Sequence, residues 1–84
     1  MPLFMDVHGS LPDGAGYDDV VQAHAADVKT QEAYGVDYRA YWFDEAQRTV
    51  FCLVDAPDAE TAIAVHTEAH GLVADRIFEV REGV

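Results

Sequence analysis

The stretch Thr49-Val-Phe-Cys-Leu-Val-Asp55 leads through Ala56-Pro-Asp58 into Ala59-Glu-Thr-Ala-Ile-Ala-Val-His66-Thr-Glu-Ala-His70-Gly71. Its first part is short, apolar and rich in β-branched residues, which predicts a strand over 49–55. Its second part carries apolar residues at helical spacing, with Asp58 placed to cap the helix and Gly71 placed to end it. The stretch therefore predicts a strand followed directly by a helix.

The chain on either side predicts one more helix and three more strands. The expected elements are a strand over 3–8, a loop over 9–16, a helix from Tyr17 or Asp18 to Tyr34, a strand over 36–44, a turn over 45–48 that makes a hairpin, and a last strand over 77–81. This β-α-β-β-α-β order predicts an α+β fold of the ferredoxin-like class, with two helices on one face of a four-stranded antiparallel sheet. We expect a single domain over residues 1–84, because the chain is too short for two.

Both faces of this sheet are expected to be largely apolar. Along the strands, Leu3, Met5 and Val7 alternate with Phe4, Asp6 and His8; Tyr38, Ala40 and Trp42 alternate with Arg39, Tyr41 and Phe43; and Val50, Cys52 and Val54 alternate with Phe51 and Leu53. Two helices cover only one face, and a large open apolar face is unusual in a monomer. We therefore expect a homodimer of the dimeric α+β barrel type, paired through the open face. The alternative is a single sheet with an unusually hydrophobic exposed face.

The formal net charge of −11 limits the range of partners. It argues against nucleic acid, which would require a basic surface, and against anionic membranes. It suits either a chain kept soluble by its charge or one whose partners are cations. The single cysteine, Cys52, lies in an apolar run and is expected to be a buried, inert thiol. The sequence shows neither a signal peptide nor a membrane-spanning stretch, so we expect a cytoplasmic protein.

Two histidines one helical turn apart are the most informative pattern for function. His66 and His70 lie at positions i and i+4 of the second helix, on one stripe with Ala59, Ala62, Ile63 and Val73. His24 shares a stripe of the first helix with Tyr17, Val20, Val21 and Val28, and His8 ends the first strand, close to Asp6. Two inward imidazoles on adjacent turns could bind one metal ion, although each histidine could equally be a packed core residue with a polar partner.

The donor types limit the metal. Imidazole with carboxylate suits nickel, zinc, copper or iron, whereas calcium and magnesium require oxygen ligands alone. The zinc-protease pattern is absent, because Thr67 follows His66 where a glutamate would stand. The carboxylates that could add a ligand or orient a ring are Asp6, Asp27, Asp44, Asp55 and Glu68.

Two other function classes remain open. The chain could be a cofactor-free small-molecule enzyme or ligand-binding module, with His66 as a base and Tyr38 and Trp42 shaping a pocket. A nucleophilic grouping of Cys52, His66 and Asp55 can be drawn, but no pattern places these residues together. Alternatively, the histidines could be packing residues of an interaction domain. No residue is assigned a catalytic role, and a binding protein is expected rather than an enzyme.

Several segments resemble one family of short bacterial proteins. They are Pro2-Leu-Phe-Met-Asp6, Tyr41-Trp-Phe-Asp44, Val50 to Asp58, and Val65-His66 through Ala74-Asp-Arg-Ile77. The family is largely of unknown function, and its best-described branch is a small nickel-binding protein with a ferredoxin-like fold that forms dimers. The resemblance implies nickel as the metal and nickel sequestration or buffering as the role. We expect the metal to be held by His66 and His70, helped by His8, Asp6 or His24.

Overall fold

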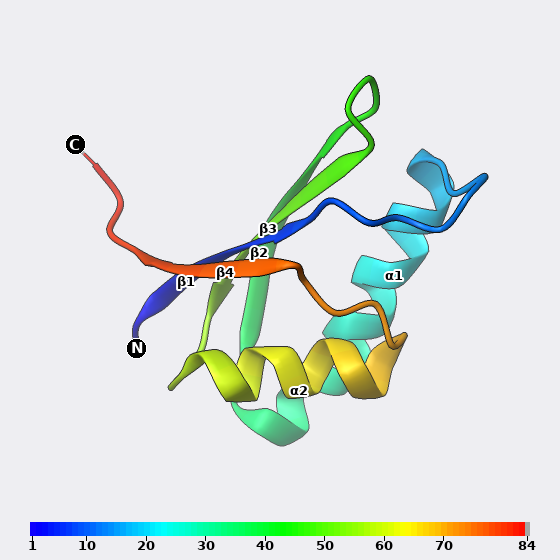
Figure 1. The fold of residues 1–84 in the computed structure, drawn as a ribbon. Helices are drawn as coiled ribbons and strands as arrows, with labels where there is room; N and C mark the ends of the chain where they lie inside the picture. Colours follow the sequence, from blue (N-terminus) through cyan, green and yellow to red (C-terminus); the bar gives the residue numbers. More distant parts are fainter. Residues whose placement is uncertain (84) are drawn as a thin grey trace.

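The computed structural model describes residues 1–83, and within them the elements follow the predicted order (Figure 1). They are β1 (Leu3–His8), α1 (Tyr17–Thr30), the 3₁₀ helix η1 (Gln31–Tyr34), β2 (Asp37–Asp44), β3 (Thr49–Asp55), α2 (Ala59–Ala69) and β4 (Arg76–Val80). The strands form an antiparallel sheet in the order β2-β3-β1-β4, and both helices lie on the same face of it (Figure 1). The predicted ferredoxin-like α+β fold is confirmed. Val84, the last residue of the predicted domain, lies outside the described part.

The first helix is shorter than predicted. Its start is as expected, and the Asp19 carboxylate accepts a hydrogen bond from the Gly16 amide at 2.8 Å. The α-helix stops at Thr30, however, and the last predicted turn is the 3₁₀ helix η1. Gly35 then takes φ 65°, a conformation that favours glycine, and ends the helical segment.

The second helix begins as predicted and positions His66. The Asp58 carboxylate accepts a hydrogen bond from the Thr61 amide at 2.8 Å, which confirms Asp58 as the N-cap. Gly71 follows the helix with φ 77°, and its amide bonds back to the His66 carbonyl at 2.9 Å. None of the helices within residues 1–83 has the length and apolar character needed to cross a membrane.

The inward faces of the helices differ from the predicted stripes. On α1 the buried residues are Val20 and Asp27, while Tyr17, Val21 and Val28 are exposed, so their predicted inward position is wrong. On α2 the buried residues are Ala62, Val65 and His66; Val65 was not predicted, and Val73, predicted to be inward, lies past the helix and is exposed. The stripe predicted for α1 is misplaced because it follows apolar residues, whereas the inward face of this helix carries Asp27.

The helix-facing side of the sheet holds the core and the first polar residues of the site. Phe4, Asp6 and His8 of β1 and Val50, Cys52 and Val54 of β3 are all buried there. The predicted alternation in these two strands is confirmed. Asp6 lies opposite Cys52 across the β1–β3 ladder, so the sheet places a carboxylate and a thiol under the helices.

Strand β2 departs from the predicted alternation. Its pairing with β3 shifts register between Tyr38 and Ala40, which leaves Arg39 as an extra residue in the strand. Such a bulge reverses the face of every following side chain. Tyr38 is therefore only 2% exposed and faces the helices, whereas Trp42 is 50% exposed on the other face. The prediction that Tyr38 and Trp42 share one face is wrong.

This burial pattern predicts the effect of two matched truncations. Val54→Ala removes methyl groups from a side chain with 0% exposure and is expected to lower the free energy of unfolding by about 2 kcal/mol. Val28→Ala makes the same chemical change on the exposed side of α1 and is expected to alter it by less than about 0.5 kcal/mol. Chemical denaturation of both variants measures the difference; a similar loss in Val28→Ala would place that face of α1 in the core.

Candidate metal centre

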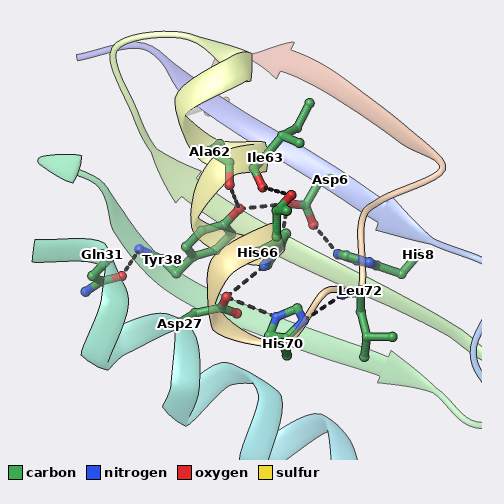
Figure 2. A network of polar contacts seen from close by, with 11 residues as sticks. Asp6, His8, Asp27, Gln31, Tyr38, Ala62, Ile63, His66, His70 and Leu72 are labelled. Atoms are coloured by element: carbon green, nitrogen blue, oxygen red, sulfur yellow. Dashed lines mark hydrogen bonds and ion pairs between the residues drawn. The ribbon is translucent and has the colours of Figure 1, made fainter. Parts of the chain in front are cut away.

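His66 lies at the centre of the site, between α1 and the sheet. Its side chain is 2% exposed, and both ring nitrogens contact a carboxylate (Figure 2). Nδ1 is 2.8 Å from Oδ1 of Asp27, and Nε2 is 2.9 Å from Oδ2 of Asp6. An ionised carboxylate only accepts hydrogen bonds, so both nitrogens donate and the ring is an imidazolium.

The pKa shifts agree with this charge assignment. Burial alone would lower the pKa of His66, but its hydrogen bonds to Asp27 and Asp6 outweigh that effect and raise it to about 9. Burial likewise tends to raise the pKa of both aspartates, yet the hydrogen bonds from His66 hold them below their usual value. One buried cation is therefore shared by two buried anions from different elements.

Asp6 is held by two further side chains. Nε2 of His8 donates to Oδ1 of Asp6 at 2.9 Å, and the His8 ring meets the His66 ring edge-on. The Tyr38 hydroxyl is 3.3 Å from Oδ2 of Asp6 and 2.9 Å from the Ala62 carbonyl, so its single proton favours the carbonyl. Burial and the nearby carboxylates raise the pKa of Tyr38, which keeps it a neutral donor.

His70 approaches the network through Asp27. Its Nε2 is 3.0 Å from Oδ1 of Asp27, but the contact is not aligned as a hydrogen bond, and Nε2 is buried with no other polar partner within residues 1–83 (Figure 2). Its Nδ1 accepts a hydrogen bond from the Leu72 amide at 3.0 Å, so the ring proton resides on Nε2. Nε2 of His70 therefore lies next to an ionised carboxylate without an aligned hydrogen bond.

Two groups of side chains bring donor atoms within 4.8 Å of one another, and His66 belongs to both. One is Asp6, His8, Cys52 and His66; the other is Asp27, His66 and His70. Residues of both groups line the adjoining cavity, but the first group is entirely buried, whereas the side chain of His70 in the second is 13% exposed. An ion would reach the second group more readily.

The thiol makes the first group a weak site. Burial raises the pKa of Cys52 far above its ordinary value, and the negative charge of Asp6 raises it further. A thiol must ionise before it can bind a metal, so Cys52 is a poor ligand here. This environment agrees with the buried, inert thiol expected from the sequence.

The other candidates lie outside both groups. The ring of His24 stacks on Tyr41, with centroids 4.4 Å apart, and its Nδ1 is buried without a polar partner within residues 1–83. Burial lowers its pKa, which leaves the ring neutral. Asp44 accepts from Gln47 in the hairpin turn, Asp55 pairs with Arg39, and Glu68 accepts from Tyr34. Asp55 is not part of any group with Cys52 and His66, so a nucleophilic grouping of these three residues has no support within the described residues.

Asp27 and Tyr38 make more of the polar contacts in the site than the sequence indicated. The sequence presents Asp27 as a carboxylate that could add a ligand or orient a ring, and Val20, His24 and Asp27 have the i, i+4, i+7 spacing of one helix face. That spacing could have identified it. Tyr38 could not be placed, because the bulge at Arg39 gives no clear signal in the sequence.

Comparisons with known proteins agree with this fold. The family model described as "Nickel responsive protein SCO4226-like" matches residues 4–80. The crystal structure of SCO4226 from Streptomyces coelicolor A3(2) superimposes with a TM-score of 0.87 at 38% sequence identity, covering 98% of this chain and 99% of that one. No curated protein matches the chain.

The His66 imidazolium predicts a specific dependence of stability on pH. Its folded-state pKa is about 9 against an ordinary 6.5, so its contribution is complete below pH 6.5 and is lost as the pH rises through about 9. In metal-free protein, the free energy of unfolding should fall by something on the order of 3 kcal/mol over this range. Denaturant unfolding at a series of pH values measures the fall.

Two variants control this experiment. Asp27→Asn removes one of the two charges that hold the proton on His66 and should shrink the fall, while His24→Gln changes a histidine outside the ion pairs and should preserve it. An imidazole of His66 that titrates near pH 6.5 by NMR would contradict the assignment.

Proposed function

The chain belongs to the SCO4226-like family of nickel responsive proteins, and from this premise we propose that it binds nickel through Asp27, His66 and His70. The observation that carries the proposal is the buried Nε2 of His70, which has no aligned hydrogen bond although it lies 3.0 Å from an ionised carboxylate. A buried polar atom in this state requires an explanation, and a cation between the two groups would supply one.

The donor set suits a transition metal. Two imidazoles and one carboxylate favour nickel, zinc, copper or iron over calcium and magnesium. Chemistry alone leaves these four metals open, and membership of the family supports nickel among them. The ion would be held in a fixed place and shielded from solvent, which suits sequestration or buffering; we assign no residue a catalytic role.

Protons must leave for His66 and His70 to act as ligands. Nδ1 of His66 carries a proton that it donates to Asp27, so this proton is lost on binding. Nε2 of His70 also carries its ring proton; if that proton moves to Nδ1, the hydrogen bond from the Leu72 amide breaks. Nickel and protons therefore compete for the same nitrogens. Nickel binding is also expected to change the hydrogen bonding of Leu72, in the segment after α2.

Asp6 and His8 support the site from the other side. Asp6 accepts from Nε2 of His66, which fixes the ring with Nδ1 directed at Asp27, and His8 in turn holds Asp6. We propose these two as orienting residues. His24 lines the adjoining cavity outside both donor groups, and we assign it no ligand role.

We further propose that the chain acts as a cytoplasmic homodimer. Trp42 and Phe78 are 50% and 40% exposed on the sheet face that no helix covers. Around them, Leu3, Met5, Leu53 and Val80 line a shallow apolar hollow together with Trp42. A second copy placed face to face would remove this surface from water, as in dimeric α+β barrels.

The proposed nickel site predicts that replacing His70, its partly exposed ligand, strongly lowers the nickel affinity. His70→Ala should weaken nickel binding by at least about tenfold in isothermal titration calorimetry, while the fold, monitored by circular dichroism, stays intact. Wild-type protein should release protons on binding, detected as a dependence of the measured heat on the ionisation enthalpy of the buffer. The Leu72 amide resonance should shift on saturation.

The matched control for His70→Ala lies on the same helix. Glu68 is exposed, and within the described residues its carboxylate accepts a side-chain hydrogen bond only from Tyr34. Glu68→Ala should leave the nickel affinity unchanged within about twofold. Equal losses in both variants would indicate diffuse attraction to an acidic surface, and an unchanged affinity in His70→Ala would remove the proposed site.

The dimer predicts a second outcome, measured by analytical ultracentrifugation. Trp42→Glu places a charge at the centre of the open sheet face and should convert a dimer into a monomer. Val21→Glu makes a similar change on the exposed side of α1 and should leave the dimer intact. Wild-type protein that sediments as a monomer would rule out the dimer without affecting the nickel site.

A further inference from the structure

A cavity of about 500 Å³ lies beside the proposed nickel site, between α1, the sheet and the loop over 9–16. Its apolar walls include Leu11, Ala23, Val50 and Leu72. Cavities of this size accommodate small organic molecules, whereas a single metal ion requires far less space. Most of the volume therefore remains unexplained by nickel binding.

The loop that closes the cavity is tied down at both ends. The Arg48 guanidinium donates to the carbonyls of Pro12 and Ala15. At the other end, Asp75 accepts from the Gly9 amide at 2.7 Å. These hydrogen bonds anchor this wall of the cavity to the rest of the fold, which is typical of ligand sites that are largely preformed.

Polar groups with unused capacity border the cavity. Nδ1 of His24 and Nε2 of His70 are both buried and lack a hydrogen bond within residues 1–83. The contacts that Asp27 makes with His66 and His70 all use Oδ1. Over the described residues no hydrogen bond involves its Oδ2, which therefore remains available to accept one from a ligand.

The charges around the cavity favour some ligands over others. Among residues 1–83, Asp13, Asp19 and Asp27 line it, and no lysine or arginine does. The imidazolium of His66 is already shared by two carboxylates. An anion would meet three lining carboxylates and, among the described lining residues, no lysine or arginine, whereas a neutral or cationic molecule would not be repelled.

We propose that this cavity binds a small neutral or cationic organic molecule, with an apolar body about the size of one aromatic ring and an N–H or O–H group that donates to Asp27. The apolar body packs against Leu11, Ala23 and Leu72, and the polar group reaches the inner end where His24 and His70 lie. This ligand does not depend on bound nickel and goes beyond the proposed function. The protein then has an organic ligand site next to its metal ligands.

Three probes of one shape test the proposal. Benzylamine, benzyl alcohol and benzoate differ in charge while keeping the same ring. On metal-free protein, NMR titration should show benzylamine and benzyl alcohol binding with roughly millimolar affinity, as expected for ligands of this size, and benzoate binding at least about tenfold more weakly. Benzoate binding as tightly as benzylamine, or no binding by any probe, would overturn the proposal.

Two pairs of variants locate the binding. Ala23→Phe fills the cavity from α1 and should abolish benzylamine binding, while Ala25→Phe adds the same ring on the exposed side of that helix and should not. Leu72→Ala removes part of the wall and should weaken binding several-fold, whereas Val73→Ala, next to it and outside the lining, should leave it unchanged. Leu72→Ala decides the question if Ala23→Phe fails to fold. Wild-type affinity in Leu72→Ala would place the ligand elsewhere.

Because these titrations use no metal, their result is separate from that of the nickel titrations. A protein that binds nickel but none of the probes retains the proposed function and loses this inference. A protein that binds benzylamine but not nickel retains the cavity ligand and loses the metal site.

Discussion

The pairing of one buried imidazolium with two buried carboxylates is the constraint on which this structure depends. Asp6 comes from β1, Asp27 from α1 and His66 from α2, so three elements that are distant in sequence meet at one charge cluster. Burying isolated charges is costly, and removing one partner leaves the others uncompensated. The cluster therefore specifies how the helices dock on the sheet, even where its net contribution to stability is modest.

The same cluster determines what the site can do. A proton on Nδ1 of His66 and a metal ion would occupy the same side of the ring, both attracted by Asp27. The raised pKa of about 9 means that the protonated state is strongly populated at neutral pH. At the proposed site a metal would have to displace this proton, which would disfavour weakly held cations relative to a transition metal with high affinity for imidazole. Selectivity of the proposed site would then follow from the cost of deprotonation as well as from the donor types.

Local patterns sufficed to predict the elements and the face of α2 that carries His66. Alternation in β1 and β3, the cap at Asp58 and the glycine after α2 are each encoded within a few residues. Local patterns could not predict which residues of α1 face inward or which face of the sheet each residue of β2 occupies. Asp27 is inward because of a partner 39 positions away, and the bulge at Arg39 changes the side of all later residues in its strand. Both features depend on tertiary contacts that a pattern of apolar residues does not record.

The contacts of His66 and His70 alter the structural basis for a metal site. Two histidines at i and i+4 were expected to face one ion directly. Instead, the ring centroids of His66 and His70 are 4.9 Å apart, and both rings contact the same carboxylate oxygen of Asp27. Spacing on one helix supplies two donors but does not orient them. A third group from a second helix is needed, and here α1 supplies it. The candidate site is therefore a property of the packing of α1 against α2, because only that packing brings Asp27 between the two rings.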